Sequence, residues 1–173
     1  NPGVVYVGGS FCNSSNPGEK NIFLGGGEMT LYMRHAYVGV LPPTGRAGSN
    51  LFLGYMAATS YPSINHVGFS VNKVLPTNWF MSTRKANVQT RTDTGVAMPN
   101  GGVWQILKLV INAAGTSADF FIDGVLVGTQ SVNMPLTTTP LLFGLLPNLW
   151  NTSNVESNVD YLGWNKVGTL DRS

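Results

Sequence analysis

Short runs of β-forming residues, each closed by glycine, proline, asparagine or serine, follow one another along this 173-residue chain. Apolar residues at helical spacing are hard to find in any window. The clearest local element is Ser117–Gln130, in which Asp123-Gly124 separates two runs of β-branched and aromatic residues. Both central positions of a type I′ turn need a positive φ, which Asp and Gly tolerate, so this pair predicts a two-residue β-hairpin. The chain is therefore expected to be all-β.

A three-stranded meander is predicted around this hairpin. Val103–Ile111 is a long β-forming run, and residues 112–116 supply a turn before the hairpin strands Ser117–Ile122 and Val125–Gln130. The other predicted strands are Glu28–Val40, Asn50–Tyr55, Val67–Val71, Asn78–Ser82, Asn87–Thr92 and Ser157–Trp164.

The number of strands bears on the architecture. About nine short strands need a way to hide their edges, and two packed sheets are the usual solution. The length suits one such domain and is short for two independent cores. We expect a single two-sheet antiparallel sandwich at 28–167, preceded by an arm or edge strand at 1–27 and followed by a tail at 168–173. The chain begins with Asn1 and not with methionine, so we expect a fragment or a processed product.

The composition indicates a surface that is polar without being ionic. Hydrophobic residues make up 43% of the chain but charged residues only 10%, whereas an ordinary soluble domain is about a quarter charged. Asn, Thr, Ser and Gly take the place of the missing charges. Such surfaces are common in extracellular and virion proteins. They also permit large subunit interfaces, because burying a neutral polar group costs far less than burying an unpaired charge.

Several classes of function are excluded by what the sequence lacks. The net charge is +2, and the closest approach to a basic stripe is Arg84, Lys85 and Arg91, interrupted by neutral residues, so nucleic-acid binding is not predicted. The longest apolar stretch, Leu141–Leu146, is too short to insert into a membrane. Cys12 is the single cysteine, which excludes an internal disulfide and a cysteine-based zinc site.

A retaining glycosidase needs two catalytic carboxylates on one strand face. Glu156 and Asp160 have i, i+4 spacing, but Glu156 is expected in a turn. Asp119 and Asp123 share the spacing, but Asp123 belongs to the hairpin turn. Glycoside hydrolysis is therefore ranked last among the functions considered.

Neither histidine chemistry nor a cofactor is predicted. His35 and His66 are each interpreted as structural residues, since a lone strand histidine without motif partners is most often one. A structural calcium ion is neither predicted nor excluded. Some carboxylates have amide neighbours that could supply further oxygen ligands, but none has the spacing of a calcium-binding loop motif. The two pairs that offer such oxygen atoms are Asp93 with Asn87 and Asp160 with Asn158.

Aromatic side chains near predicted loops and strand ends are the remaining ligand-binding candidates. Sugar-binding sandwiches stack sugars on exposed Trp and Tyr faces, although core burial is the more frequent role of such residues. Trp150 is preferred because a polar loop at 151–154 follows it, while Trp104, inside the long strand, is expected in the core. The candidate ligand-binding residues are Trp150, Trp79, Tyr61 and Tyr55.

The segment Leu141–Trp150 is unusually apolar and lacks clean alternation. One interpretation is a strand covered on both faces, followed by a loop. The other is an oligomer contact, because an exposed patch of this kind would be unfavourable in water. The candidate interface residues are Leu142, Phe143, Leu145, Leu146 and Leu149. Val103–Ile111 is also apolar on both sides, which suits a strand between a core and a partner subunit.

The order of several short segments resembles a known family. The segments are 53–56 (LGYM), 60–62 (SYP), 67–69 (VGF), 78–80 (NWF), 93–96 (DTGV), 104–107 (WQIL), 121–124 (FIDG) and 159–161 (VDY). Together they resemble the concanavalin A-like (laminin G-like) jelly roll of bacteriophage virion proteins over about residues 28–167. The most distinctive stretch is FFIDGVLVGTQ followed by NMP.

The resemblance implies two curved antiparallel sheets and a place on a phage particle, as a capsid decoration, fibre or tail protein. It also implies a homo-oligomer, with a trimer favoured. The chain departs from the related glucanases, which carry a Glu-x-Asp-x-x-Glu strand, and from lectins with a dense Asp/Asn metal loop. Because this fold hosts enzymes, lectins and structural modules, it does not fix the function.

The sequence therefore predicts a non-enzymatic accessory protein at the virion surface, which acts by assembly and surface adhesion. Its partners would be further copies of itself and other virion proteins. The alternative is a carbohydrate-binding module that recognises a glycan on the host cell surface. Glycoside hydrolysis is the third hypothesis.

Overall fold

The computed structural model describes residues 22–38, 49–57, 63–71, 78–99, 101–149 and 156–167. Over these residues no helix reaches the length and hydropathy needed to cross a membrane. The regular elements described are ten strands: β1 (Glu28–Val38), β2 (Ser49–Met56), β3 (His66–Val71), β4 (Asn78–Lys85), β5 (Val88–Ala97), β6 (Trp104–Ile111), β7 (Ala118–Ile122), β8 (Val125–Gln130), β9 (Leu142–Leu149) and β10 (Glu156–Val167).

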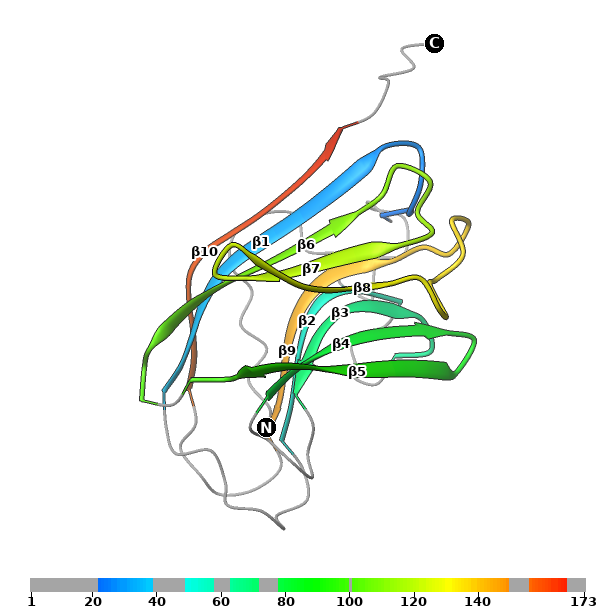
Figure 1. The fold of residues 1–173 in the computed structure, drawn as a ribbon. Coiled ribbons are helices and arrows are strands. Elements are labelled where there is room, and N and C mark those ends of the chain that lie inside the picture. The colour runs from blue at the N-terminus through cyan, green and yellow to red at the C-terminus, as the bar shows by residue number, and fades with distance from the viewer. Residues whose placement is uncertain are drawn as a thin grey trace.

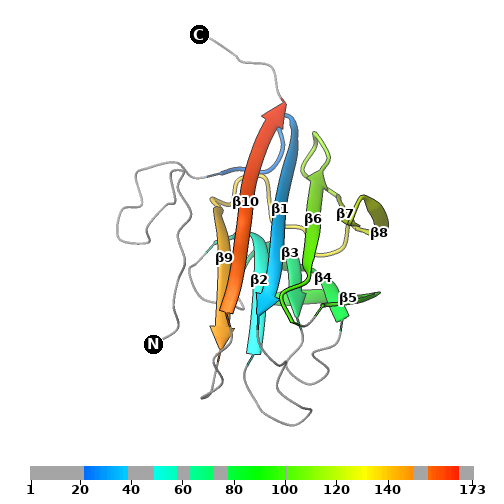
Figure 2. The ribbon, with the colours of Figure 1, turned by 90° about the vertical axis from the view of Figure 1, so that its left-hand side faces the viewer.

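The strands form two five-stranded sheets that pack as two layers (Figure 1). The first sheet has the order β10-β1-β6-β7-β8, and the second has the order β5-β4-β3-β2-β9. Figure 2 shows the strands of the first sheet in front of those of the second. Neighbouring strands pair antiparallel in both sheets. The predicted two-sheet antiparallel jelly-roll sandwich is confirmed.

The predicted strands are present, and their ends differ by a few residues. The largest difference is in β5, which runs on to Ala97, and β4 and β10 run on to Lys85 and Val167. Apart from Val96 and Ala97, the residues added to β4 and β5 are polar residues and a glycine, so the apolar pattern of the sequence did not mark them. The segment Leu141–Trp150 forms β9 along most of its length. The expectation that Glu156 lies in a turn is wrong, because Glu156 opens β10 and pairs with Val38.

The predicted hairpin between β7 and β8 is confirmed. Asp123 and Gly124 have φ values of 50° and 83°, as a type I′ turn requires. The turn is also fastened to β6: the backbone N–H of Asp123 donates to the carbonyl of Ile106 at 2.8 Å, and the Asp123 carboxylate accepts from the N–H of Ile106 at 2.8 Å. Strands β6, β7 and β8 therefore form the predicted meander.

The core lies between the sheets and is rich in aromatic contacts. Trp79 and Phe120 are both fully buried. The ring of Phe69 contacts both, edge to face, with centroid separations of 6.1 Å to Trp79 and 5.1 Å to Phe120. Residues ahead of β1 add to this core, since Ile22 pairs with Leu141 and Leu24 is buried. Burial of large aromatic surfaces is the main stabilising contribution here.

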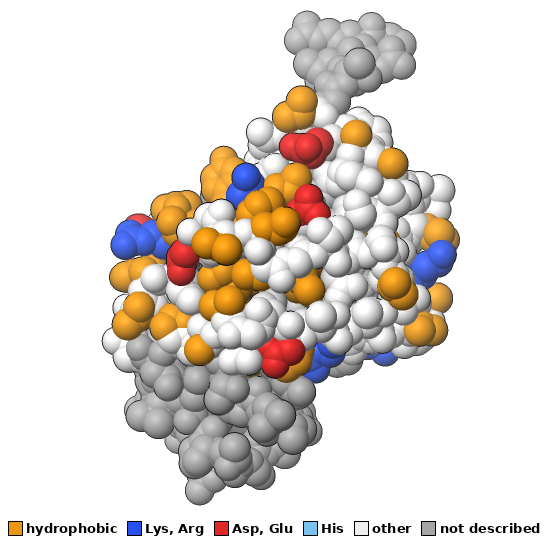
Figure 3. Space-filling model, viewed as in Figure 1, with side chains coloured by type: hydrophobic (Ala, Val, Ile, Leu, Met, Phe, Trp, Pro, Cys, Tyr) orange, Lys and Arg blue, Asp and Glu red, His pale blue; other side chains and the backbone are white. Residues whose placement is uncertain are grey.

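The outer face of the first sheet carries apolar side chains among charged ones. Figure 3 shows hydrophobic side chains gathered over β6–β8, with acidic and basic side chains around them. Trp104 is 38% exposed and lies on this face, where the guanidinium of Arg34 stacks over its ring at 5.0 Å. The expectation that Trp104 belongs to the core is therefore wrong. Both faces of β6 are apolar, so its sequence pattern did not show which one turns inward.

Candidate functional site

Two of the four residues predicted to bind a ligand are not at the surface. Trp79 and Tyr55 are fully buried. The indole N–H of Trp79 donates to Oε1 of Gln105 at 2.8 Å, and the Tyr55 ring packs against Phe143 with centroids 5.8 Å apart. A buried ring presents no face to a sugar, so the prediction is wrong for both. Trp150 and Tyr61 lie outside the described residues and stay predictions.

The predicted interface segment forms the edge strand β9 of the second sheet. Leu142 and Phe143 are half-buried, and Phe143 packs against the core. The packing of Phe143 against the core therefore explains in part why this segment is apolar. The side chains of Leu145, Leu146 and Leu149 lie outside what the structure describes. The oligomer contact stays a prediction.

The residues considered for calcium have other partners. The Asp93 carboxylate accepts from the amide of Asn78 at 3.0 and 3.2 Å and from the backbone N–H of Gly95 at 2.8 Å. Asn87 accepts from Arg84, and Asp160 pairs with Arg34 at 2.5 Å. Within the described part of the chain, no group of three or more His, Cys, Asp or Glu side chains is arranged to hold a metal ion.

A cluster of polar side chains occupies the outer face of β3, β4 and β5. Trp79 and Met81 of β4 point into the core, so the alternate residues of this strand point outward. Residues directly opposite on neighbouring strands share a face. Ser82 lies opposite Gly68 and Arg91, and Arg84 lies opposite His66 and Gln89. We call this set the outer-face cluster: His66, Ser70, Ser82, Arg84, Gln89 and Arg91.

A directed chain of hydrogen bonds runs through the cluster. Nδ1 of His66 lies 3.2 Å from the carbonyl oxygen of Ser63, which can only accept, so Nδ1 carries the proton. Nε2 then accepts from the hydroxyl of Ser82 at 2.8 Å. The same hydroxyl oxygen accepts from the amide of Gln89 at 2.9 Å. These bonds fix the orientation of the Gln89 amide at the half-buried rim of the cluster.

His66 is held in its neutral form. The pKa of His66 is lowered from 6.5 to about 4, mainly by burial and also by the positive charges of Arg84 and Arg91, while the hydrogen bond to the Ser63 carbonyl opposes the shift. The two guanidiniums are therefore close enough to act on the imidazole. Burial also lowers the pKa of His35, in the core beside Trp79, to about 4.

These two histidines make the stability depend on pH. Between pH 6.5 and 4 the unfolded chain binds protons that the folded protein does not, so the free energy of unfolding falls as the pH is lowered. The loss is about 1.4 kcal/mol per pH unit for each histidine, and it is absent above pH 6.5. We expect chemical denaturation to show lower stability at pH 5 than at pH 7. In His66→Gln the drop should be smaller, and an unchanged drop would contradict the assignment.

Two guanidiniums of the cluster have unsatisfied donors. Arg91 stacks over the ring of Phe80 at 4.9 Å, and its Nη2 donates to Ser70 at 3.3 Å. Arg84 donates from Nη2 to the side-chain oxygen of Asn87 over a long distance, 3.4 Å. In the part of the chain that the structure describes, Nε and Nη1 of Arg84 and Nε of Arg91 are buried and have no hydrogen-bond acceptor. Neither arginine forms an ion pair with a carboxylate of the described residues. The ion pair found among those residues joins Arg34 and Asp160.

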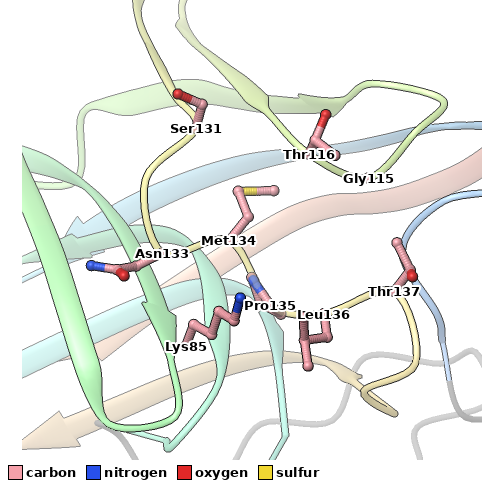
Figure 4. A pocket seen from close by; sticks show the side chains of 9 residues that line it. All are labelled: Lys85, Gly115, Thr116, Ser131, Asn133, Met134, Pro135, Leu136 and Thr137. Carbon is pink, nitrogen blue, oxygen red and sulfur yellow. The ribbon is translucent and has the colours of Figure 1, made fainter.

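A separate cavity of about 380 Å³ lies beside the β6–β7 turn (Figure 4). Its walls come from Gly115 and Thr116 of that turn, from the segment 131–137 and from Lys85 at the end of β4. The amide of Asn133, in the same wall, already donates to Thr90 at 2.9 Å. The cavity offers one ammonium and scattered hydroxyl groups, and the outer-face cluster is the stronger candidate because its donors converge.

Sequence reasoning missed the cluster because it depends on strand register. Arg84 and Arg91 are seven positions apart in the sequence, and the hairpin between β4 and β5 brings them onto one face. The signal that identifies this hairpin is Ala86-Asn87, whose φ values of 47° and 72° make a two-residue turn. A predicted strand starting at Asn87 conceals that turn, and with it the pairing of Lys85 with Val88.

Comparison with known proteins shows the fold and no closer relationship. No protein-family model and no curated protein sequence matches the chain. The carbohydrate recognition domain of Emp47p is similar in structure, with a TM-score of 0.60 at 11% identity, over 85% of this chain and 75% of that one. A variant of human galectin-16 has a TM-score of 0.53 at 13% identity, over 91% and 99%. The alginate lyase AlyC3 has a TM-score of 0.53 at 10% identity, over 84% and 67%.

Proposed function

We propose that this domain binds carbohydrate through the outer-face cluster. The observation that carries the proposal is the convergence of an oriented amide, Gln89, with two half-buried guanidiniums, Arg84 and Arg91, on one sheet face. Sugar hydroxyls both donate and accept hydrogen bonds, and a few convergent polar groups beside an apolar surface are what ligand sites offer. The ring of Phe80 supplies apolar surface under Arg91.

The similar folds support a carbohydrate ligand in general terms. One similar structure is named a carbohydrate recognition domain, and another is named an alginate lyase. Binding without turnover is the simpler role for this cluster, because its imidazole is neutral and both ring nitrogens already have partners. A general acid or base needs a pKa near the working pH and access to the substrate.

The test is a glycan array that includes neutral and acidic saccharides, probed with the purified domain. The double variant Gln89→Ala/Arg91→Ala is expected to weaken any binding at least ~10-fold, as loss of central contacts does. The matched control is Arg34→Ala, which removes an arginine from the outer face of the other sheet and should leave binding unchanged. Absence of binding to every saccharide, or equal binding by the double variant, would remove the proposal.

For the location at which such binding would act, we keep the prediction made from the sequence. The low charge and the family resemblance support a phage particle and a homo-oligomer, with a trimer favoured. A carbohydrate-binding domain on a phage particle would bind a glycan on the host cell surface. Light scattering on the purified domain measures the oligomeric mass directly.

A further inference from the structure

The buried nitrogen atoms of Arg84 and Arg91 point to a class of ligand. A charged donor removed from water without a hydrogen bond costs free energy, and such groups in folded proteins call for an acceptor. Three such nitrogens belong to two arginines on this sheet face: Nε and Nη1 of Arg84 and Nε of Arg91. Uncharged sugar hydroxyls are weak acceptors for this purpose. Carboxylate and sulfate oxygens form charge-assisted bonds with guanidinium that are about twice as strong as neutral ones.

The charges of the cluster also favour a ligand with a carboxylate or sulfate group. Arg84 and Arg91 both act on the pKa of His66, and neither has a carboxylate partner among the described residues. The nearest carboxylate along β5, Asp93, lies two residues beyond Arg91 and is bound by Asn78 and by the backbone of Gly95. The half-buried setting lowers the effective dielectric, so the positive potential at this face is less screened than at an open surface.

We propose that the outer-face cluster selects an acidic saccharide, whose carboxylate or sulfate group binds between Arg84 and Arg91. The inference rests on the proposed carbohydrate binding and adds the charge of the ligand. Guanidinium is suited to this role because it is planar, always charged and weakly hydrated. The hydrogen-bonded amide of Gln89 then contacts the neighbouring hydroxyl groups of the same saccharide.

The decisive probe is one polysaccharide with and without its charge. Polygalacturonate and its methyl ester share a backbone and differ in the carboxylate. We expect affinity electrophoresis or calorimetry to show at least ~10-fold tighter binding of the acid, with an affinity that falls as sodium chloride is raised. Dextran sulfate against dextran gives the same comparison for sulfate, so the two pairs identify which group is preferred.

Variants connect the preference to the two arginines. Arg84→Gln and Arg91→Gln should each lower the affinity for the acidic probe about 10- to 100-fold and lower the affinity for its neutral partner by a smaller factor, so that the preference for the acid shrinks. Arg34→Gln removes the same charge from the opposite face and should change neither. Thermal unfolding without ligand supplies an independent measure: Arg84→Gln should be at least as stable as the parent, because a guanidinium with two buried, unpaired nitrogens has been removed.

The outcomes separate the two proposals. Equal affinity for the acidic and the neutral member of both pairs would overturn the charge preference and leave carbohydrate binding intact. A preference that survives both cluster variants would place the anion elsewhere and would also overturn this inference. Failure of every saccharide to bind would remove the proposed function itself.

Discussion

Replacing Trp79 with alanine is expected to lower the free energy of unfolding by about 3–5 kcal/mol. The indole is fully buried at the centre of the sandwich. Its loss leaves a cavity between Phe69 and His35, whose rings contact it edge to face. It also removes the partner of Gln105, whose amide oxygen accepts from the indole N–H at 2.8 Å. Chemical denaturation at pH 7 measures the difference.

The control for this variant is Trp104→Ala. Trp104 is 38% exposed on the outer face of the first sheet, so its removal leaves no internal cavity. Its loss should cost about 1 kcal/mol or less, from the lost contact with Arg34. Equal losses of stability for the two tryptophans would contradict the assignment of Trp79 to the core.

Gly54→Ala is expected to destabilise the second sheet by about 2–4 kcal/mol. An added Cβ would lie 2.3 Å from the carbonyl oxygen of Val67 and 2.6 Å from Cα of Gly68. Both atoms are backbone, so β2 and β3 would have to separate to relieve the overlap. Gly54 pairs with Gly68 on one side and with Gly144 on the other, so the disturbance would reach β9 as well.

Gly95→Ala separates steric overlap from backbone strain. Gly95 has a φ of +71°, and an added Cβ would meet nothing within 4 Å. This variant should therefore cost only the left-handed strain, about 1–2 kcal/mol. Thermal and chemical denaturation of both variants give the comparison. A loss for Gly54→Ala no larger than that for Gly95→Ala would show that the sheet adjusts freely at this point.

Local chemistry explains what the sequence predicted well. The hairpin at Asp123-Gly124 depends on two adjacent residues and their φ preferences, and it was predicted correctly. The strands follow from short apolar runs, since each run has to be buried somewhere. The polar ends of β4 and β5 carry little apolar pattern, and there the predicted boundaries were short.

The sequence did not predict which side of a strand faces the core, nor the register between distant strands. Whether Trp79 or Trp104 is buried depends on which side of its strand meets the other sheet, and both strands have apolar residues on either side. The outer-face cluster requires the register of β3, β4 and β5 together, which joins residues up to 25 positions apart, from His66 to Arg91. Such long-range pairing leaves no local signal in a single sequence.

The extra residue in β10 affects how readily another chain could pair with this edge of the first sheet. Arg34 pairs with Tyr161 and His35 with Val159, so Asp160 is left over as a β-bulge in the edge strand of the first sheet. An edge strand is a template on which another chain can add a strand. A bulge interrupts the regular spacing of backbone groups and twists the strand, and here it also carries a charge at the edge. Extension of this sheet by a strand of another chain at the β10 edge is thereby opposed.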